Sequence, residues 1–225
     1  MGTNHRGKQD RPRISLVPGG QPSRRRPSAS AGTARKEQAR SVASRQALLE
    51  ATVQTLMERG YSGLSMSEVA ARAGASKGAL AHHFPTKADL VLTATFACFD
   101  EALSRTEKLL RDQSVLKDPI RAFIEDSIGL YFDWPFIAAL EVLVVARTDA
   151  ELMAQIEPAI SNYRSRSNAL WVDALERSGV APRDAREQVS LTTNLIRGLA
   201  VYRLWHRDQR ETSELLRSWE RLLKR

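Results

Sequence analysis

Three helix-start signals lie within residues 65–90, at intervals too short for ordinary helices. Ser65 and Glu68 have the S-x-x-E spacing of a capping box, in which a hydroxyl and a carboxylate each accept a backbone N–H at a helix start. We therefore expect a helix to begin at Met66. It has room for about two turns, because Gly74 can adopt the positive φ that ends a helix.

A second short helix is expected directly after this turn. Ser76 can cap it, and Pro85 ends it because proline has no backbone N–H to donate. Thr86 and Asp89 then repeat the capping pattern for a third helix. Two short helices joined by a glycine-containing turn form a helix-turn-helix, whose second helix can enter the major groove of DNA. A plain corner in an all-helical protein has the same spacing, so the spacing alone leaves both interpretations open.

The same segment carries a longer pattern, with matching positions at Ser65, Val69, Ala70, Ala73-Gly74, Ser76 to Leu80, His83-Phe84, Lys87 and Leu90. In order and spacing this pattern resembles the DNA-binding signature of TetR-type transcriptional regulators. One position departs from it, because Ala81 stands where the family usually has a tyrosine that contacts a backbone phosphate. Either that phosphate contact is missing here or His82 replaces it.

Candidates for contact with DNA are Ser65, Ser76, Lys77, Gly78, Ala79, His82, His83, Thr86 and Lys87. Lys77 can bind guanine acceptors or a phosphate, and Gly78 permits a close approach of the backbone. Hydroxyls at helix starts suit phosphates, although helix capping alone is a sufficient reason for them. Adjacent helical residues such as His82 and His83 point about 100° apart, and no Cys or carboxylate lies near them. We therefore expect neither a metal site nor a cofactor.

The positive charge is concentrated at the N-terminus. Residues 1–45 contain 11 of the 34 Lys and Arg but 2 of the 26 Asp and Glu, so the formal net charge of +8 belongs to this segment. Residues 1–43 are rich in Pro, Gly, Ser and Arg, and we expect a disordered tail because they cannot bury enough surface to fold. The tail is either a phosphate-seeking arm that reinforces DNA binding or a solvated extension without a role.

Other classes of protein lack support in the sequence. The single cysteine, Cys98, excludes an internal disulfide and a cysteine-rich zinc site. The longest apolar run, Ala138 to Ala146, is too short to span a membrane and contains Glu141. No nucleophile elbow, phosphate-binding glycine loop or metal-binding helix motif is present. We therefore expect a cytoplasmic protein that is not an enzyme.

The rest of the chain has helical periodicity, so the predicted fold is all-α. Residues 44–59 form the first helix of a three-helix DNA-binding domain at 44–90, and Gly60 ends that helix. Residues 91–225 form a helical domain that the resemblance assigns to effector binding and dimerisation. The further helices are expected at 87–113, 118–133, 135–147, 148–178, 182–206 and 212–224.

The helix expected at 182–206 is apolar on two faces, so it must be buried on two sides. A two-fold interface of four helices would bury its second face, and the resemblance also implies a homodimer joined through the last two helices. One apolar face carries Val189, Thr192, Ile196 and Leu199. The other carries Leu191, Leu195 and Trp205. The predicted interface residues are Val189, Thr192, Ile196, Leu199, Leu215, Trp219 and Leu222.

The resemblance also implies a small molecule that shifts the spacing of two DNA-binding heads. Aromatic residues that can line an apolar pocket are Phe96, Phe99, Phe123, Tyr131, Trp134 and Trp171, with Asn194 and Arg197 as its polar groups. For any single aromatic, plain core packing is the favoured explanation, and the prediction is of the pocket as a whole more than of its individual members.

These observations predict a homodimeric repressor that a partly apolar effector releases from a palindromic operator in double-stranded DNA. Three alternatives stay open. The protein can be an activator of the same type, or an architectural DNA-binding protein that needs no ligand. It can also be a helical interaction module with a vestigial helix-turn-helix, for which Ala81 is the argument.

Overall fold

The structure, a computed structural model, describes residues 29–132, 134–206 and 208–224, and within these ranges every regular element is helical. The all-α prediction is confirmed. The elements are α1 (Ala29–Gly63), α2 (Met66–Arg72), α3 (Lys77–His83), α4 (Lys87–Leu109), the 3-10 helix η1 (Gln113–Lys117), α5 (Pro119–Tyr131), α6 (Trp134–Ala146), α7 (Ala150–Arg177), α8 (Pro182–Tyr202) and α9 (Gln209–Leu223).

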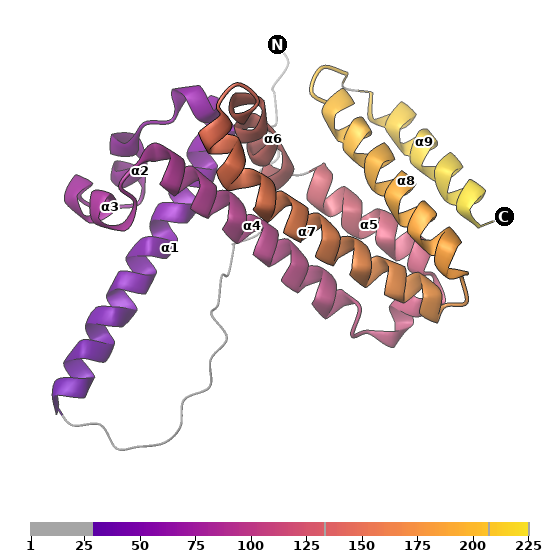
Figure 1. The fold of residues 1–225 in the computed structure, drawn as a ribbon, viewed down its shortest axis with the longest axis horizontal. Helices are drawn as coiled ribbons and strands as arrows, with labels where there is room; N and C mark the ends of the chain where they lie inside the picture. The colour runs from indigo at the N-terminus through magenta and orange to yellow at the C-terminus, as the bar shows by residue number, and fades with distance from the viewer. Residues whose placement is uncertain (1–28, 133, 207, 225) are drawn as a thin grey trace, which may run out of the picture.

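Helices α2 and α3 lie at one end of the molecule, and α8 and α9 lie at the other (Figure 1). Helices α4 and α7 run side by side between the two ends, while α5 packs against both α8 and α9. Helix α6 contacts α1, α4 and α7. It therefore connects the end that carries α2 and α3 to the rest of the chain.

One hydrophobic core holds the first end together. It includes Leu48 on α1, Val69 on α2, Leu80 on α3 and Val142 on α6, and each of these side chains is at most 2% exposed. Because Val142 belongs to this core, the helix-turn-helix shares its interior with residues far along the chain. The boundary expected at residue 90 therefore crosses a continuous core inside α4.

Two further clusters fill the opposite end. Trp171 on α7 packs with Phe123 on α5 and Val189 on α8, and its side chain is 1% exposed. Ile196 on α8 and Leu216 on α9 belong to the second cluster. Burying such side chains supplies about 1.5–3 kcal/mol each, so these contacts hold α8 and α9 to α5 and α7.

Helix α1 begins at Ala29, well before the start expected at Ser44. Residues 29–43, where we predicted a disordered tail, are rich in Ala with Arg, Lys, Glu and Gln, which are strong helix formers. Residues 38–43 are exposed on every side, and burial begins at Ser44. The absence of a periodic apolar face before Ser44 thus marks where packing against the core begins. Helix propensity extends α1 from there towards the N-terminus, beyond the core. The predicted tail at residues 1–28 lies outside the described residues.

The three predicted caps form. The hydroxyls of Ser65, Ser76 and Thr86 accept the backbone N–H three residues further on, at 3.2, 3.1 and 3.0 Å. The capping box at Thr86 is complete, because Asp89 accepts the Thr86 N–H at 3.1 Å. Gly74 follows α2 with a φ of 65°, as its place in the sequence predicts.

Other helix ends differ from the expected positions by a few residues. Helix α4 ends at Leu109 and α8 at Tyr202, both earlier than predicted. Helix α7 begins at Ala150, two residues later than expected, and is capped by Asp149, whose carboxylate accepts the N–H of Leu152 at 3.0 Å. A carboxylate directly before a helix binds the free N–H groups of its first turn, which is why the helix begins there.

Across the described ranges, no helix on its own is long and apolar enough to cross a membrane. Helices α5 and α6 reach that length and composition together, as a pair bent by 60°. Both helices contribute buried side chains to the clusters described above, including Phe123 and Val142.

Candidate DNA-binding surface and effector cavity

Helices α2 and α3 form the predicted helix-turn-helix. Helix α3 buries Leu80 in the core and exposes Lys77, Gly78 and His82 on its outer face. Ala81 also lies on that exposed face. Its departure from the family pattern therefore removes a large side chain from the exposed surface of this helix, beside an exposed histidine.

The remaining candidate residues for DNA contact differ in their exposure and in the bonds that they already make. Ser65 and Ser76 are exposed at the starts of α2 and α3, where their hydroxyls cap these helices. Ala79 and His83 are partly buried on α3. Thr86 is exposed, but its hydroxyl already donates to Asp89 Oδ2 at 2.8 Å as well as capping α4.

Lys87 does not extend outward as a candidate phosphate ligand should. Its Nζ lies 4.6 Å from the centre of the Tyr61 ring and donates to the carbonyl of Ser62 at 3.5 Å. Partial burial lowers the pKa of the Lys87 ammonium. Lys87 therefore holds the connection between α1 and α2 in place.

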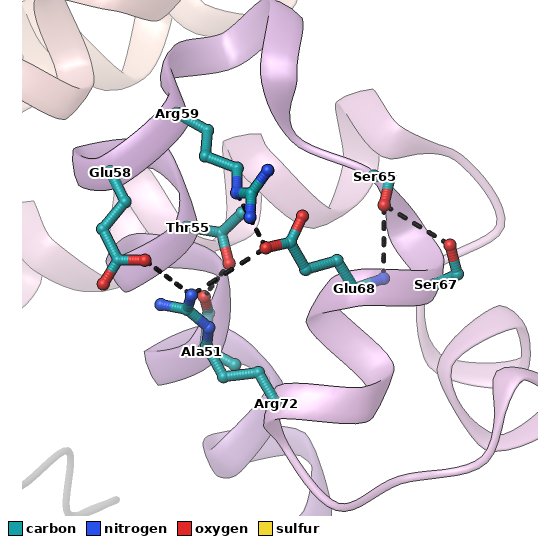
Figure 2. A network of polar contacts seen from close by, with 8 residues as sticks. All are labelled: Ala51, Thr55, Glu58, Arg59, Ser65, Ser67, Glu68 and Arg72. Carbon is teal, nitrogen blue, oxygen red and sulfur yellow. Dashed lines mark hydrogen bonds and ion pairs between the residues drawn. The ribbon is translucent and has the colours of Figure 1, made fainter.

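Charged side chains fix α2 against the end of α1 (Figure 2). Arg72 Nη2 lies 2.6 Å from Glu58 Oε2, and Arg59 Nε lies 2.9 Å from Glu68 Oε1. Because Glu68 faces Arg59, only the hydroxyl half of the capping box predicted at Ser65 forms. Each pair is partly exposed and contributes at most about 1 kcal/mol, so the main effect of the network is to orient α2.

A small cavity lies between α5, α7 and α8, with a volume of about 10 Å³. That volume holds one water molecule. Aromatic rings form much of its wall, and the Phe123 and Trp171 ring centroids lie 5.1 Å apart. The lining residues are Phe123, Asp126, Ser127, Leu130, Tyr131, Tyr163, Arg164, Ser167, Asn168, Trp171 and Thr193.

Three of the predicted pocket residues, Phe123, Tyr131 and Trp171, lie together in this lining. Phe96 packs instead against the core that holds α1 to α4, and Phe99 stacks on the Tyr163 ring with a centroid distance of 4.9 Å. Asn194 is exposed on α8, where it bonds to the Ser190 carbonyl and to Arg197, and neither residue reaches the cavity. The side chain of Trp134 lies outside the described residues.

Polar residues of the lining were not predicted. Tyr163, Ser167 and Trp171 follow one another at four-residue spacing on α7, which places them on one face of the helix. Asp126 lies on α5 near the same space. This spacing was available in the sequence, but the prediction took the polar groups of the pocket from α8, at Asn194 and Arg197, and not from α7.

Four of the predicted dimer-interface residues are buried within the single chain. Val189, Thr192, Ile196 and Leu199 are 0–7% exposed, because this face of α8 packs onto α5, α7 and α9. Trp219 is partly buried as well and donates its Nε1–H to the Thr192 hydroxyl at 2.8 Å. The prediction that this face of α8 meets a partner is therefore wrong.

The exposed face of α8 is its second apolar face. Leu191 on α8 is 56% exposed, Trp205 just beyond the end of α8 is 67% exposed, and Leu215 and Leu222 on α9 are 44% and 56% exposed. Helical periodicity showed that α8 has two apolar faces, but it does not show which of them faces the inside.

Helix α6 contacts both the wall of the cavity and the end of α1 beside the helix-turn-helix. Its Phe136 ring contacts Tyr131 of the cavity wall edge to face, with centroids 5.0 Å apart. Its Glu141 Oε2 accepts the backbone N–H of Tyr61 at 3.1 Å, next to the kink at Gly60. Side chains of one helix thus contact the cavity wall and the end of α1.

Comparison with known proteins identifies the class of molecule. Residues 48–94 match the family model described as bacterial regulatory proteins, tetR family. The chain is 31% identical over 162 residues to the HTH-type transcriptional regulator CymR of Pseudomonas putida, an overlap of 72% of this chain and 80% of that protein. This chain belongs to the TetR family. As a TetR-family member it is a transcriptional regulator of the helix-turn-helix type and not an enzyme.

Other proteins similar to this TetR-family regulator include an activator and two regulators of known structure with a bound small molecule. It is 32% identical over 146 residues to the HTH-type transcriptional activator FasR of Mycolicibacterium smegmatis, covering 57% of this chain and 66% of FasR. It superposes on FadR from Bacillus subtilis in complex with stearoyl-CoA with a TM-score of 0.59 at 18% identity, covering 79% of this chain and 96% of that chain. It superposes on a regulator from Saccharomonospora viridis in complex with choline with a TM-score of 0.61 at 20% identity, covering 80% and 93%. These two likenesses support the fold alone.

Proposed function

We propose that this TetR-family regulator is a homodimeric repressor that a small-molecule effector releases from a palindromic operator. The observation that carries the proposal is the exposed face of α3, where Lys77, Gly78 and His82 lie free of the core. A helix-turn-helix dimer places two such helices in successive major grooves, about 34 Å apart along the DNA. In this proposal residues 44–90 form the DNA-binding domain, and the protein acts in the cytoplasm.

The dimer in this proposal forms through α8 and α9. Leu191, Trp205, Leu215 and Leu222 are large apolar side chains that the single chain leaves exposed. A two-fold axis brings the same patch of two copies together, so each exposed side chain gains an apolar partner. Residues 91–225 are then the effector-binding and dimerisation part.

The effector in this proposal enters the cavity between α5, α7 and α8. It must bind one spacing of the two DNA-binding heads better than the other, because equal affinity shifts nothing. Helix α6 supports such a coupling through Tyr131 at one contact and Tyr61 at another. Structures of the same fold hold stearoyl-CoA and choline, so the fold leaves the charge of the effector open.

The small size of the cavity favours a second candidate. A volume of about 10 Å³ is close to the filled core that a ligand-independent architectural DNA-binding protein would have. In the repressor proposal this filled state is the ligand-free form, and an effector enters only when side chains of the wall move.

Selection of genomic DNA fragments by the purified protein, at near-physiological salt, tests the proposal. We expect one short inverted repeat, and we expect Lys77→Ala to weaken its binding at least about tenfold because a base contact contributes about 1–3 kcal/mol. Unrelated fragments that dissociate together as salt rises would contradict sequence-specific binding. Repeat binding that no metabolite extract weakens would favour the architectural protein.

A further inference from the structure

Two charged residues, Asp126 and Arg164, belong to the cavity lining. The charge that an effector must carry depends on which of them is available to it. An ionised side chain that already has its partners neither needs nor attracts a ligand, whereas one without partners favours a ligand of opposite sign. The partners of each residue therefore decide the question.

Asp126 has partners at both carboxylate oxygens. Arg105 Nε donates to Oδ1 at 3.2 Å, and the Thr106 hydroxyl donates to Oδ2 at 2.7 Å. The Arg105 guanidinium also donates to the Asp126 backbone carbonyl at 3.3 Å. The carboxylate side chain is 8% exposed, so its charge is balanced from α4 and is not left for a cationic ligand.

Arg164 has no hydrogen bond and no ion pair within the part of the chain that the structure describes. The nearby Arg166 differs, because its Nη2 lies 3.2 Å from Glu107 Oε1. Arg164 is exposed at the rim, so a charged ligand group that meets it stays in contact with water. Burial raises the pKa of the Tyr131 phenol, while the Arg197 and Arg164 charges act in the opposite direction.

We infer that the effector is an organic anion, whose apolar body enters between the aromatic rings and whose charged group pairs with Arg164. The inference rests on the proposed effector function of this cavity. With Asp126 neutralised by Arg105, Arg164 is the charged lining residue left without a partner among the described residues, and the Phe123 and Trp171 rings supply apolar surface beside polar side chains such as Ser167 and Asn168. Arginine binds a carboxylate or phosphate through two parallel hydrogen bonds, which orients the ligand at the rim.

Calorimetric titration of the full-length protein with charge-matched compounds tests this inference. The panel places a carboxylate, a neutral amide or a trimethylammonium group on the same phenyl body, and again on the same octyl body. We expect the carboxylate to bind about three- to fivefold more tightly than the amide, because an ion pair with an exposed arginine contributes at most about 1 kcal/mol. The cation should bind most weakly.

Arg164→Gln should abolish the preference for the carboxylate, and Arg164→Lys should restore part of it. Arg166→Gln is the matched control, since it removes the same charge from the same helix at a side chain paired with Glu107. An unchanged preference in Arg164→Gln, or tighter binding of the cation, would overturn the inference. Equal binding of all three head groups would contradict the inference that the effector is an anion, but it would agree with the proposal that the cavity binds an effector. No binding by any compound would contradict both, while selection of operator DNA would still test the regulator independently.

Discussion

Gly60→Ala tests the kink where α1 meets the helix-turn-helix. Gly60 has a φ of 66° and a ψ of 177°, a region that is nearly closed to other residues, so alanine there costs about 1–3 kcal/mol. An added Cβ would lie 2.5 Å from Glu141 Oε2, so the carboxylate must move and release the Tyr61 N–H. The lost hydrogen bond adds about 1 kcal/mol. We expect the free energy of unfolding to fall by about 3 kcal/mol.

Urea denaturation followed by circular dichroism measures this loss, at one protein concentration because a dimer gains stability with concentration. Gly74→Ala is the matched control, since Gly74 has a φ of 65° but an added Cβ there meets nothing within 4 Å. A loss at Gly60 no larger than at Gly74 would refute the role of Glu141. So would an equal cost of Gly60→Ala when Glu141 has already been replaced by alanine.

Three further predictions follow from burial and exposure. Leu191→Glu should weaken dimerisation at least about tenfold by placing like charges across the two-fold axis, and sedimentation equilibrium measures it; an unaffected dimer would contradict the proposed interface. Trp219→Phe removes the donor to the buried Thr192 hydroxyl and should lower the free energy of unfolding by about 1–2 kcal/mol in thermal melts, whereas an unchanged Tm would mean that this bond contributes nothing. Burial raises the pKa of the Cys98 thiol from 9.0 to about 12, so the native thiol should react with Ellman's reagent at pH 8 far more slowly than the unfolded one. Rapid labelling of the native protein would show that the thiol is accessible and would contradict this prediction. The raised pKa of Cys98 also means that the free energy of unfolding should fall as pH rises from about 9 to about 12.

Local signals in the sequence were sufficient for the helix-turn-helix. The caps at Ser65, Ser76 and Thr86 involve atoms three residues apart, so their spacing alone determines them. The other half of the capping box at Ser65 fails because Glu68 meets Arg59, a residue from a different helix. A pairing of that kind depends on how the helices pack, which residue spacing does not show.

The candidate site was harder to predict, for two physical reasons. Both faces of α8 are apolar. The sequence therefore does not show that the face with Val189 and Ile196 points into the chain while the face with Leu191 points to solvent. The cavity collects side chains from α5, α7 and α8, and only the packing of these helices brings Phe123 and Trp171 together while placing Phe96 elsewhere.

The shared core of α1, α2, α3, α4 and α6 has a consequence for dissecting the molecule. A fragment that ends at residue 90 keeps the recognition helix but loses Val142, which is fully buried in that core. Such a fragment would expose apolar surface to water on the side that α6 covers, and we expect it to be at best marginally folded. The DNA-reading unit is therefore not a detachable module, and a shift of α6 acts on its interior directly, without passing through a linker.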